Sequence, residues 1–225
     1  MREIVIDTET TGLSYKTGDR VIEVGCVELI NHVATNKSLQ FYCKVDKEIS
    51  DGAQRITGIT NKFLSDKKYF SDHCDDLLKF IDNDPLIIHN ADFDVGFINN
   101  ELSLLGRSKL SNPIVDTVSL ARKVLNTRVA NLDYLCRRFK VDLSERDLHG
   151  ALLDSRLLAE VYLELTGGRQ SSLVFKQPSN NARSVIKGTE TVHKELELIS
   201  AFVTKEEEKE HSIMLKKIIE PIWER

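Results

Sequence analysis

The sequence predicts an α/β fold followed by a helical tail. Short apolar runs that are typical of buried strands alternate with segments whose apolar residues recur at helical spacing. After residue 168 the composition becomes polar, and helical patterning returns only from residue 191. With 225 residues, the chain is long enough for one domain of roughly 150 residues and an appendage.

Five strands are expected, each from a short apolar run bounded by polar or turn residues: 4–7, 21–30, part of 33–45, 86–88 and 114–115. Asn31 and His32 form the turn between the second and third strands. In the third strand Leu39, Phe41 and Cys43 alternate with polar residues, as on a half-buried strand. The second and third strands are therefore expected to pair as an antiparallel hairpin.

Helices are expected where apolar side chains are three and four residues apart: 70–81, 94–105, 117–125, 132–139 and 150–166. In the first of these, Leu77, Leu78 and Ile81 share one face. Gly106 ends the second helix, and Gly167 and Gly168 stop the last one. Helices that follow short strands in this way are typical of an α/β domain.

The chain divides into three parts by composition. Residues 1–169 form the main domain, 170–190 a linker rich in Ser, Asn and Lys, and 191–225 a helical tail. Thr204 and Glu207 have the spacing of a capping box, so a helix is expected to begin there and to end near Pro221.

Charge, hydropathy and cysteine content argue against several classes of protein. The net charge of −4 gives no basic field of the kind that marks a tight, non-specific nucleic-acid binder. No apolar run approaches the roughly 20 residues of a membrane span, and the N-terminus has no signal-peptide pattern. The four cysteines have neither zinc-site nor secreted-disulfide spacing. A reducing cytoplasm is the expected compartment.

The first chemical signal is a pair of carboxylates at the end of the first strand. Asp7 and Glu9 are one residue apart, so in a strand their side chains share a face. Two carboxylates on one face of a buried strand repel each other unless a cation lies between them. Since Mg²⁺ and similar cations prefer carboxylate oxygens, the sequence predicts a metal site.

Three other aspartates are candidate partners. Asp94 follows the strand 86–88 and begins a helix, although Asp92 or Asp94 could instead be only an N-cap. Asp154 lies within a helix, whereas Gly150 indicates that His149 lies on the preceding loop. The alternative is an ordinary surface histidine with a solvated aspartate. Asp116 could support the metal ligands or cap the next helix, and the cap is favoured.

Taken in order, three motifs resemble the DEDDh 3′–5′ exonucleases, which have an RNase H-like fold: Asp7-x-Glu9, Asp94, and His149-x4-Asp154. The segments 10–13, 114–117 and 149–154 are similar to those of the proofreading subunits of bacterial replicative DNA polymerases. The resemblance covers about residues 1–170. It implies a mixed five-stranded sheet flanked by helices.

The resemblance also implies the chemistry. Four residues would hold two Mg²⁺ or Mn²⁺ ions: Asp7, Glu9, Asp94 and Asp154. His149 would be the general base, and one nucleoside monophosphate would leave a frayed or single-stranded 3′ DNA end per cycle. The implied function is removal of mispaired 3′-terminal nucleotides for a replicative polymerase.

Further positions match those that surround the terminal nucleotide in this family: Asp7, Thr8, Glu9, Gly12, Leu13, Gly52, Thr57, Phe93 and Asp154. For Leu13 and Phe93 the alternative is core packing. Two positions depart from the family pattern, because many relatives have histidine at Thr57 and an acidic residue at Gly52. Side-chain contacts to the nucleotide are therefore in doubt there.

The segment 170–175 resembles the short clamp-binding motif of replication proteins, with Gln170, Leu173 and Phe175 as its anchors. The alternative is the edge of a linker. The resemblance further implies that the tail binds the polymerase (alpha) subunit, with packing on the nuclease domain as the alternative. It leaves room for a small accessory subunit.

Two rival functions differ in class or substrate. A free-standing RNA- or oligonucleotide-trimming exonuclease of this fold usually lacks such a linker and tail. A non-catalytic scaffold between clamp and polymerase would not need four carboxylates and a histidine in this arrangement. Both alternatives are therefore less well supported than the proofreading exonuclease.

Overall fold

The computed structural model describes residues 1–144, 146, 148–167 and 204–215. The chain falls into two units, Met1–Val174 and Phe175–Arg225. Within the described residues, every helix is too short or too polar to cross a membrane.

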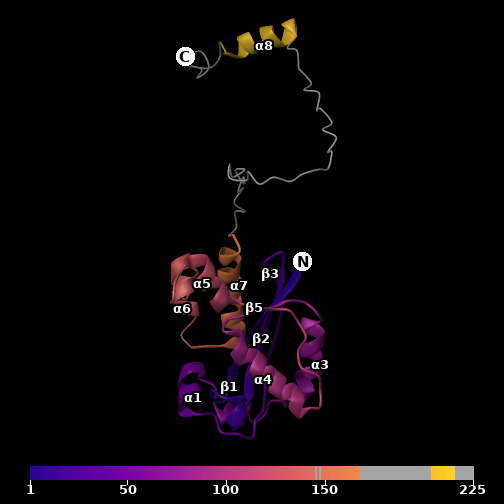
Figure 1. Ribbon diagram of the computed structural model, residues 1–225, viewed down its shortest axis with the longest axis vertical. Helices are drawn as coiled ribbons and strands as arrows, with labels where there is room; N and C mark the ends of the chain where they lie inside the picture. Colours follow the sequence, from indigo (N-terminus) through magenta and orange to yellow (C-terminus); the bar gives the residue numbers. More distant parts are fainter. Residues whose placement is uncertain (145, 147, 168–203, 216–225) are drawn as a thin grey trace, which may run out of the picture. The chain divides into compact units, whose positions relative to one another are not determined.

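The first unit is built around one mixed sheet with the strand order β3-β2-β1-β4-β5 (Figure 1). Its strands are β1 (Arg2–Thr10), β2 (Val21–Ile30), β3 (Val33–Tyr42), β4 (Leu86–Ile88) and β5 (Ile114–Asp116). The first three pair antiparallel, whereas β1, β4 and β5 are parallel. The mixed five-stranded sheet expected from the sequence is confirmed.

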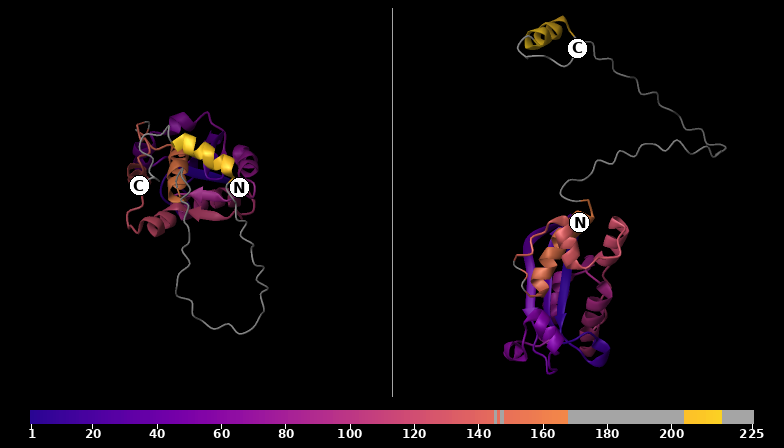
Figure 2. Two further views of the ribbon diagram at one scale, coloured as in Figure 1. Left: turned by 90° about the horizontal axis from the view of Figure 1, so that it is seen from above. Right: turned by 90° about the vertical axis from the view of Figure 1, so that its left-hand side faces the viewer.

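Helices cover both faces of this sheet (Figures 1 and 2). On one face α3 (Phe70–Ile81) and α4 (Ala91–Leu104) pack on Ile4 and Ile6. On the other, α5 (Thr117–Leu125), α6 (Leu132–Phe139) and α7 (Ala151–Leu165) pack on Val5 and Ile87. Alternate residues of β1 thus enter two different cores, which is the consequence of the strand's period of two.

Several predicted elements have the expected bounds, namely β2, α3, β4, α5 and α6. The Asn31–His32 turn is also confirmed, and both residues have positive φ angles (52° and 68°), as type I′ hairpin turns require. The strand predicted at 4–7 is longer, because its pairing with β2 continues to Thr10.

Two expectations were wrong or incomplete. The helix predicted from residue 94 begins at Ala91, and its N-cap is Asn90 rather than Asp92 or Asp94. The helices α1 (Asp51–Thr57) and α2 (Asn61–Leu64) were not predicted. The local signals for α1 are the Ser50 side chain, which accepts a hydrogen bond from Ala53 N, and Gly58, which ends the helix with φ 70°.

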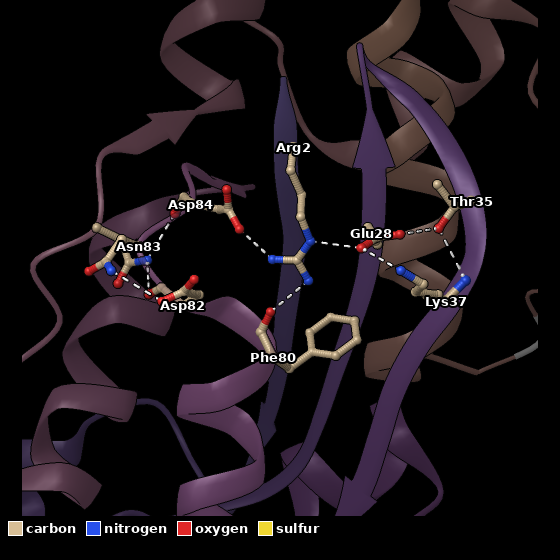
Figure 3. Close-up of polar contacts among 9 residues, drawn as sticks. Arg2, Glu28, Thr35, Lys37, Phe80, Asp82, Asn83 and Asp84 are labelled. Carbon is tan, nitrogen blue, oxygen red and sulfur yellow. Dashed lines mark hydrogen bonds and ion pairs between the residues drawn. The ribbon is translucent and has the colours of Figure 1, made fainter.

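An ion-pair network fixes the beginning of β1 (Figure 3). The Arg2 guanidinium donates to Glu28 Oε1 (2.7 Å), to the Phe80 carbonyl oxygen (2.8 Å) and to Asp84. Glu28 also accepts a hydrogen bond from Thr35 Oγ1 on β3 (2.8 Å). The network joins β1, β2, β3, the end of α3 and the segment before β4, and so helps to fix the relative positions of these strands.

The second unit contains the described helix α8 (Lys205–Leu215). Thr204 N donates to Glu207 Oε2 (2.8 Å), and Glu207 N donates to Thr204 Oγ1 (3.3 Å). This is the predicted capping box. The helical patterning expected from residue 191 and the expected end near Pro221 lie outside the described residues.

Candidate active site

The carboxylate pair lies on β1, on the face that α7 covers. Val5 on the same face contacts the α7 core, so Asp7 and Glu9 point the same way, as predicted. In the sheet, Asp7 pairs with Gly25 and Glu9 pairs with Glu23. Because β1, β4 and β5 are parallel, their carboxyl ends meet at one edge, where ligand sites of α/β sheets usually lie.

Gly25 allows α7 to approach this edge closely. A Cβ atom built on Gly25 would lie 2.2 Å from Leu152 N and 2.4 Å from the Ala151 carbonyl oxygen. Ser155 Oγ donates a hydrogen bond to the Gly25 carbonyl oxygen (2.9 Å). The first turn of α7 therefore rests on the backbone opposite Asp7, and this contact brings Asp154 to the site.

Gly25→Ala is expected to lower the melting temperature and the activity together. The added methyl group must displace the α7 backbone, and overpacking of this kind costs about 1–3 kcal/mol. The matched control for the melting temperature is Gly52→Ala, because a Cβ there meets nothing within 4 Å; it does not control for activity, since Gly52 is one of the residues expected around the terminal nucleotide. Thermal unfolding followed by circular dichroism would measure both variants. A Gly25→Ala protein that melts at the wild-type temperature would contradict the close-approach argument.

Asp94 reaches the site from the opposite face. It lies in the first turn of α4, its side chain is buried, and its Oδ1 accepts a hydrogen bond from Thr8 Oγ1 (2.6 Å). The start of α4 is held by Asp116, whose Oδ1 accepts from Asn90 N (3.0 Å). Asp116 also caps α5 through Ser119 N (3.1 Å), as favoured from the sequence.

Asp154 contacts His149, as predicted, and also Arg146, which the sequence did not predict as a site residue. Arg146 donates from Nε to Asp154 Oδ1 (2.6 Å) and from Nη2 to Oδ2 (2.7 Å). The ring nitrogen Nδ1 of His149 is 3.3 Å from Asp154 Oδ2. Arg146 also pairs with Asp133 on α6. The available signal was an arginine three residues before the histidine, which is weak because charged loop residues are common.

The carboxylates at the end of β1 carry charge that the protein compensates only in part. Burial, and then Asp94, Glu9 and Asp154, raises the pKa of Asp7 well above its ordinary value. Burial and the neighbouring Asp154 raise the pKa of Glu9 to about 8. The pKa of Asp94 is raised to about 7 by burial.

Asp154 differs from these neighbours. Burial alone would raise its pKa, but hydrogen bonds from His149 and Arg146 outweigh burial and lower it. Glu23 adds a further acid, because its buried Oε2 has no hydrogen-bond partner among the described residues. Buried oxygens with excess negative charge are the donor set that hard divalent cations prefer, so the residues fit such ions. Consistent with this, Glu9, His149 and Asp154 offer ligand atoms within 4.8 Å of one another.

The metal-free protein is expected to lose stability as pH rises. A carboxyl group whose folded-state pKa exceeds its unfolded value stabilises the fold below the unfolded pKa, and this stability is lost through the folded pKa. For Glu9 and Asp94 this window runs from about pH 4 to pH 8. Each pKa unit corresponds to about 1.4 kcal/mol, or roughly 3–5 °C in Tm at this chain length.

Melting curves in EDTA and in Mg²⁺ across this range would test the expectation. Mg²⁺ should raise Tm more at the alkaline end than at the acidic end, and Asp94→Asn should raise Tm in EDTA at the alkaline end. A metal-free Tm that is flat over the whole range would contradict it.

Two adjoining cavities lie at this edge of the sheet. One of about 370 Å³ has these lining residues: Asp7, His89, Asn131, Leu132, Asp133, Arg146, His149 and Asp154. The other, of about 250 Å³, has these: Thr8, Glu9, Thr10, Gly12, Leu13, Ser50, Gly52, Ala53, Ile56, Thr57 and Phe93. Of the nine residues expected around the terminal nucleotide, seven line the smaller cavity. The other two, Asp7 and Asp154, line the larger one.

The core-packing alternative fails for Leu13, whose side chain is 87% exposed. Phe93 both lines the smaller cavity and packs on Phe97, with ring centroids 4.8 Å apart. Thr57 is buried, and its hydroxyl donates to the Ala53 carbonyl oxygen (2.9 Å) within α1. The hydroxyl is thus already engaged, whereas Gly52 leaves open space.

The histidine loop is attached to the wall of the smaller cavity. His149 N donates to the Ile56 carbonyl oxygen (3.0 Å), and the side chain of Leu148 occupies the space over Gly58. His149 therefore lies on the loop, as expected, and is tied to α1. The expected clamp-binding residues Gln170, Leu173 and Phe175 lie outside the described residues.

Comparison with known proteins gives consistent similarities. The family model described as Exonuclease (RNase T) matches residues 4–162. DNA polymerase III subunit epsilon of Rickettsia felis is 46% identical over 226 residues, with 97% of each chain covered, so the aligned region extends into the tail.

Solved structures share the fold at lower identity. The nuclease domain of 3′hExo, described as a DEDDh family member bound to rAMP, has a TM-score of 0.65 and 17% identity, covering 73% of this chain and 91% of that one. Exonuclease X in complex with 5′ overhanging duplex DNA has a TM-score of 0.59 and 22% identity, with the same coverage.

Proposed function

Because this chain belongs to the RNase T exonuclease family and, within it, to the epsilon subunits of DNA polymerase III, we propose that its clustered carboxylates hold the divalent cations of a proofreading nuclease. The chain is a 3′–5′ exonuclease, and its family depends on divalent metals. The proposed ligands are Asp7, Glu9, Asp94 and Asp154. The observation that carries the proposal is the convergence of these four side chains from β1, α4 and α7 at one edge of the sheet.

We propose two Mg²⁺ or Mn²⁺ ions per site. When bound, such a pair supplies charge neutralisation and Lewis acidity for an in-line displacement at phosphorus. Asp7 is the proposed shared ligand, because Asp94, Glu9 and Asp154 all lie close enough to raise its pKa. Thr8 keeps Asp94 oriented through the hydrogen bond to Oδ1.

His149 is the proposed general base. With Nδ1–H donating to Asp154, Nε2 keeps a lone pair that can accept the proton of the attacking water. An imidazole pKa near neutrality suits this transfer. The water oxygen then bonds to the terminal phosphorus, and the bond from phosphorus to the 3′ oxygen of the preceding nucleotide breaks. The 3′ oxygen keeps the electron pair and takes a proton from solvent, and a nucleoside 5′-monophosphate leaves.

The smaller cavity is proposed to hold the terminal nucleotide. Leu13, Ile56 and Phe93 give it apolar walls against which a base and sugar can pack, a contact that does not depend on sequence. Preference for mispaired ends then follows from their easier fraying, since the terminal nucleotide must leave the duplex to enter the cavity.

A 3′-mismatched primer–template tests the proposed function. The purified chain with Mg²⁺ should release monophosphates from the mismatched 3′ end faster than from a matched end, and EDTA should stop the reaction. An RNA of the same sequence tests the trimming alternative. Absence of metal-dependent monophosphate release from DNA would contradict the proposal.

The proposed partners are the polymerase (alpha) subunit through residues 191–225, the sliding clamp through 170–175, and a small accessory subunit. Residues 1–169 would be the nuclease domain and 170–190 the linker, in the cytoplasm. Tethering agrees with the net charge of −4, because a polymerase that holds the DNA supplies a high effective concentration of 3′ ends.

Deletion of residues 176–225 is expected to preserve nuclease activity and to abolish binding to the polymerase subunit. Hydrolysis of single-stranded DNA should stay within about twofold of the full chain, because every proposed site residue lies before residue 155. Co-purification with the polymerase subunit should be lost. Retention of the polymerase by the truncated chain would contradict the assignment of the tail.

A further inference from the structure

Arg146 contacts several residues of the site and has no role in the proposed mechanism. Its guanidinium is held by two parallel hydrogen bonds to Asp154, at 2.6 and 2.7 Å. Only 8% of its side chain is exposed, and Asp154 is 6% exposed. Paired, planar contacts of this kind fix orientation as well as charge.

The same guanidinium lies between three segments. Its Nη1 pairs with Asp133 in the first turn of α6, and its Nη2 is 3.2 Å from His149 Nδ1. Asp154 belongs to α7, and His149 to the loop before it. One side chain thus joins α6 to the proposed metal ligand of α7, and Oδ2 of that ligand lies 3.3 Å from His149 Nδ1.

Two physical roles predict opposite effects on metal binding. If the guanidinium blocked the cation, its removal would tighten binding. If it orients the carboxylate, its removal would weaken binding, because hydrogen bonds to a ligating carboxylate fix its direction.

The contacts favour orientation. An ionised carboxylate offers about four lone-pair directions, and Arg146 uses one on each oxygen. The His149 Nδ1–H takes the second direction on Oδ2, so one direction on Oδ1 remains for a cation, and Asp154 still offers an atom within 4.8 Å of those of Glu9 and His149. Asp133 balances the positive charge of Arg146, which reduces its repulsion of a nearby cation.

We propose that Arg146 is a positioning residue that orients the Asp154 carboxylate, and through it the His149 ring, for divalent-cation binding and proton transfer. It acts through these two side chains and has no contact with the reacting atoms. This inference rests on the proposed function, because it takes Asp154 as a metal ligand.

Arg146→Gln and Arg146→Lys test the proposal by Mn²⁺ titration calorimetry together with kinetics. Arg146→Gln is expected to weaken Mn²⁺ binding and to lower kcat by roughly 10–100-fold each, with KM for DNA within about twofold. Arg146→Lys keeps the charge but lacks the planar fork, so it should recover only part of the loss. Circular dichroism and Tm establish that each variant is folded, and the lysine variant serves if the glutamine variant is not.

Two further variants sharpen the result. Arg107→Gln removes an arginine from an exposed pair with Asp75 (2.7 Å) and should change neither Mn²⁺ affinity nor kcat. Asp133→Asn removes the other anchor of Arg146 and should give a partial loss. Added to Arg146→Gln, it should have little further effect, because both changes act through the same contact.

Each outcome separates the possibilities. Tighter Mn²⁺ binding by Arg146→Gln would show a blocking role, and a raised KM with unchanged Mn²⁺ affinity would show a DNA contact; either overturns the proposal. Unchanged affinity and kcat would overturn it as well. If the wild-type chain itself neither binds Mn²⁺ nor releases monophosphates, the proposed function fails rather than this inference alone.

Discussion

Asp7→Asn is expected to abolish metal-dependent release of nucleotides while the protein stays folded. The change removes one charge at the centre of the carboxylate cluster and keeps the shape of the side chain. Loss of a shared cation ligand forfeits several kcal/mol of transition-state stabilisation. A loss of about 4 kcal/mol corresponds to a rate lower by roughly 10³-fold.

The same substitution lowers activity but is expected to raise the stability of the metal-free protein. Burial and four neighbouring carboxylates oppose the ionisation of Asp7 in the metal-free protein. Asparagine removes that repulsion, so in EDTA at alkaline pH the variant should melt above the wild-type chain. Asp75→Asn, a change in an exposed surface pair, is the control for both measurements. An Asp7→Asn protein with wild-type kcat in Mg²⁺ would contradict the role given to this residue.

His149→Ala is expected to lower kcat by roughly 10²–10⁴-fold, the usual contribution of a positioned general base. The four carboxylates remain, so Mn²⁺ binding should persist. The loss should therefore appear in turnover rather than in cation affinity.

The pH profile distinguishes a general base from a structural residue. The hydrogen bond to Asp154 raises the pKa of His149 above its ordinary value. Because the neutral ring accepts the proton, wild-type kcat should fall as pH decreases through that pKa. At saturating Mg²⁺, which keeps Glu9 and Asp94 ionised, the variant should lose this acidic limb. His211→Gln, at an exposed position of α8, is the control. A variant that keeps the acidic limb would contradict the assignment.

The sequence predicted the parts of the site that depend on local pattern. An apolar run followed by Asp7 and Glu9 is a strand signal and a chemical signal together, and the paired strand places both side chains on one face. Gly150 correctly separated a loop histidine from a helical aspartate. The resemblance supplied the expected nucleotide residues, seven of which line one cavity.

What the sequence did not predict depends on contacts between distant segments. In the sequence Gly25 is an ordinary glycine within a strand, and only the structure shows that the α7 backbone packs directly on it. Arg146 is one charged loop residue among many until its neighbours on α6 and α7 are known. The start of α4 was misplaced because Asn90 begins it with a positive φ angle, held by Asp116 from another strand. Such features require the tertiary structure.

We propose that four carboxylates from β1, α4 and α7 hold two catalytic cations. The most direct test is the stoichiometry of Mn²⁺ binding, measured by calorimetry with a nucleoside monophosphate present, for the wild-type chain and Asp7→Asn. Two ions are expected per wild-type chain, and at least one should be lost in the variant. Wild-type protein that binds no Mn²⁺, or an Asp7→Asn variant that binds both ions with unchanged affinity, would contradict it.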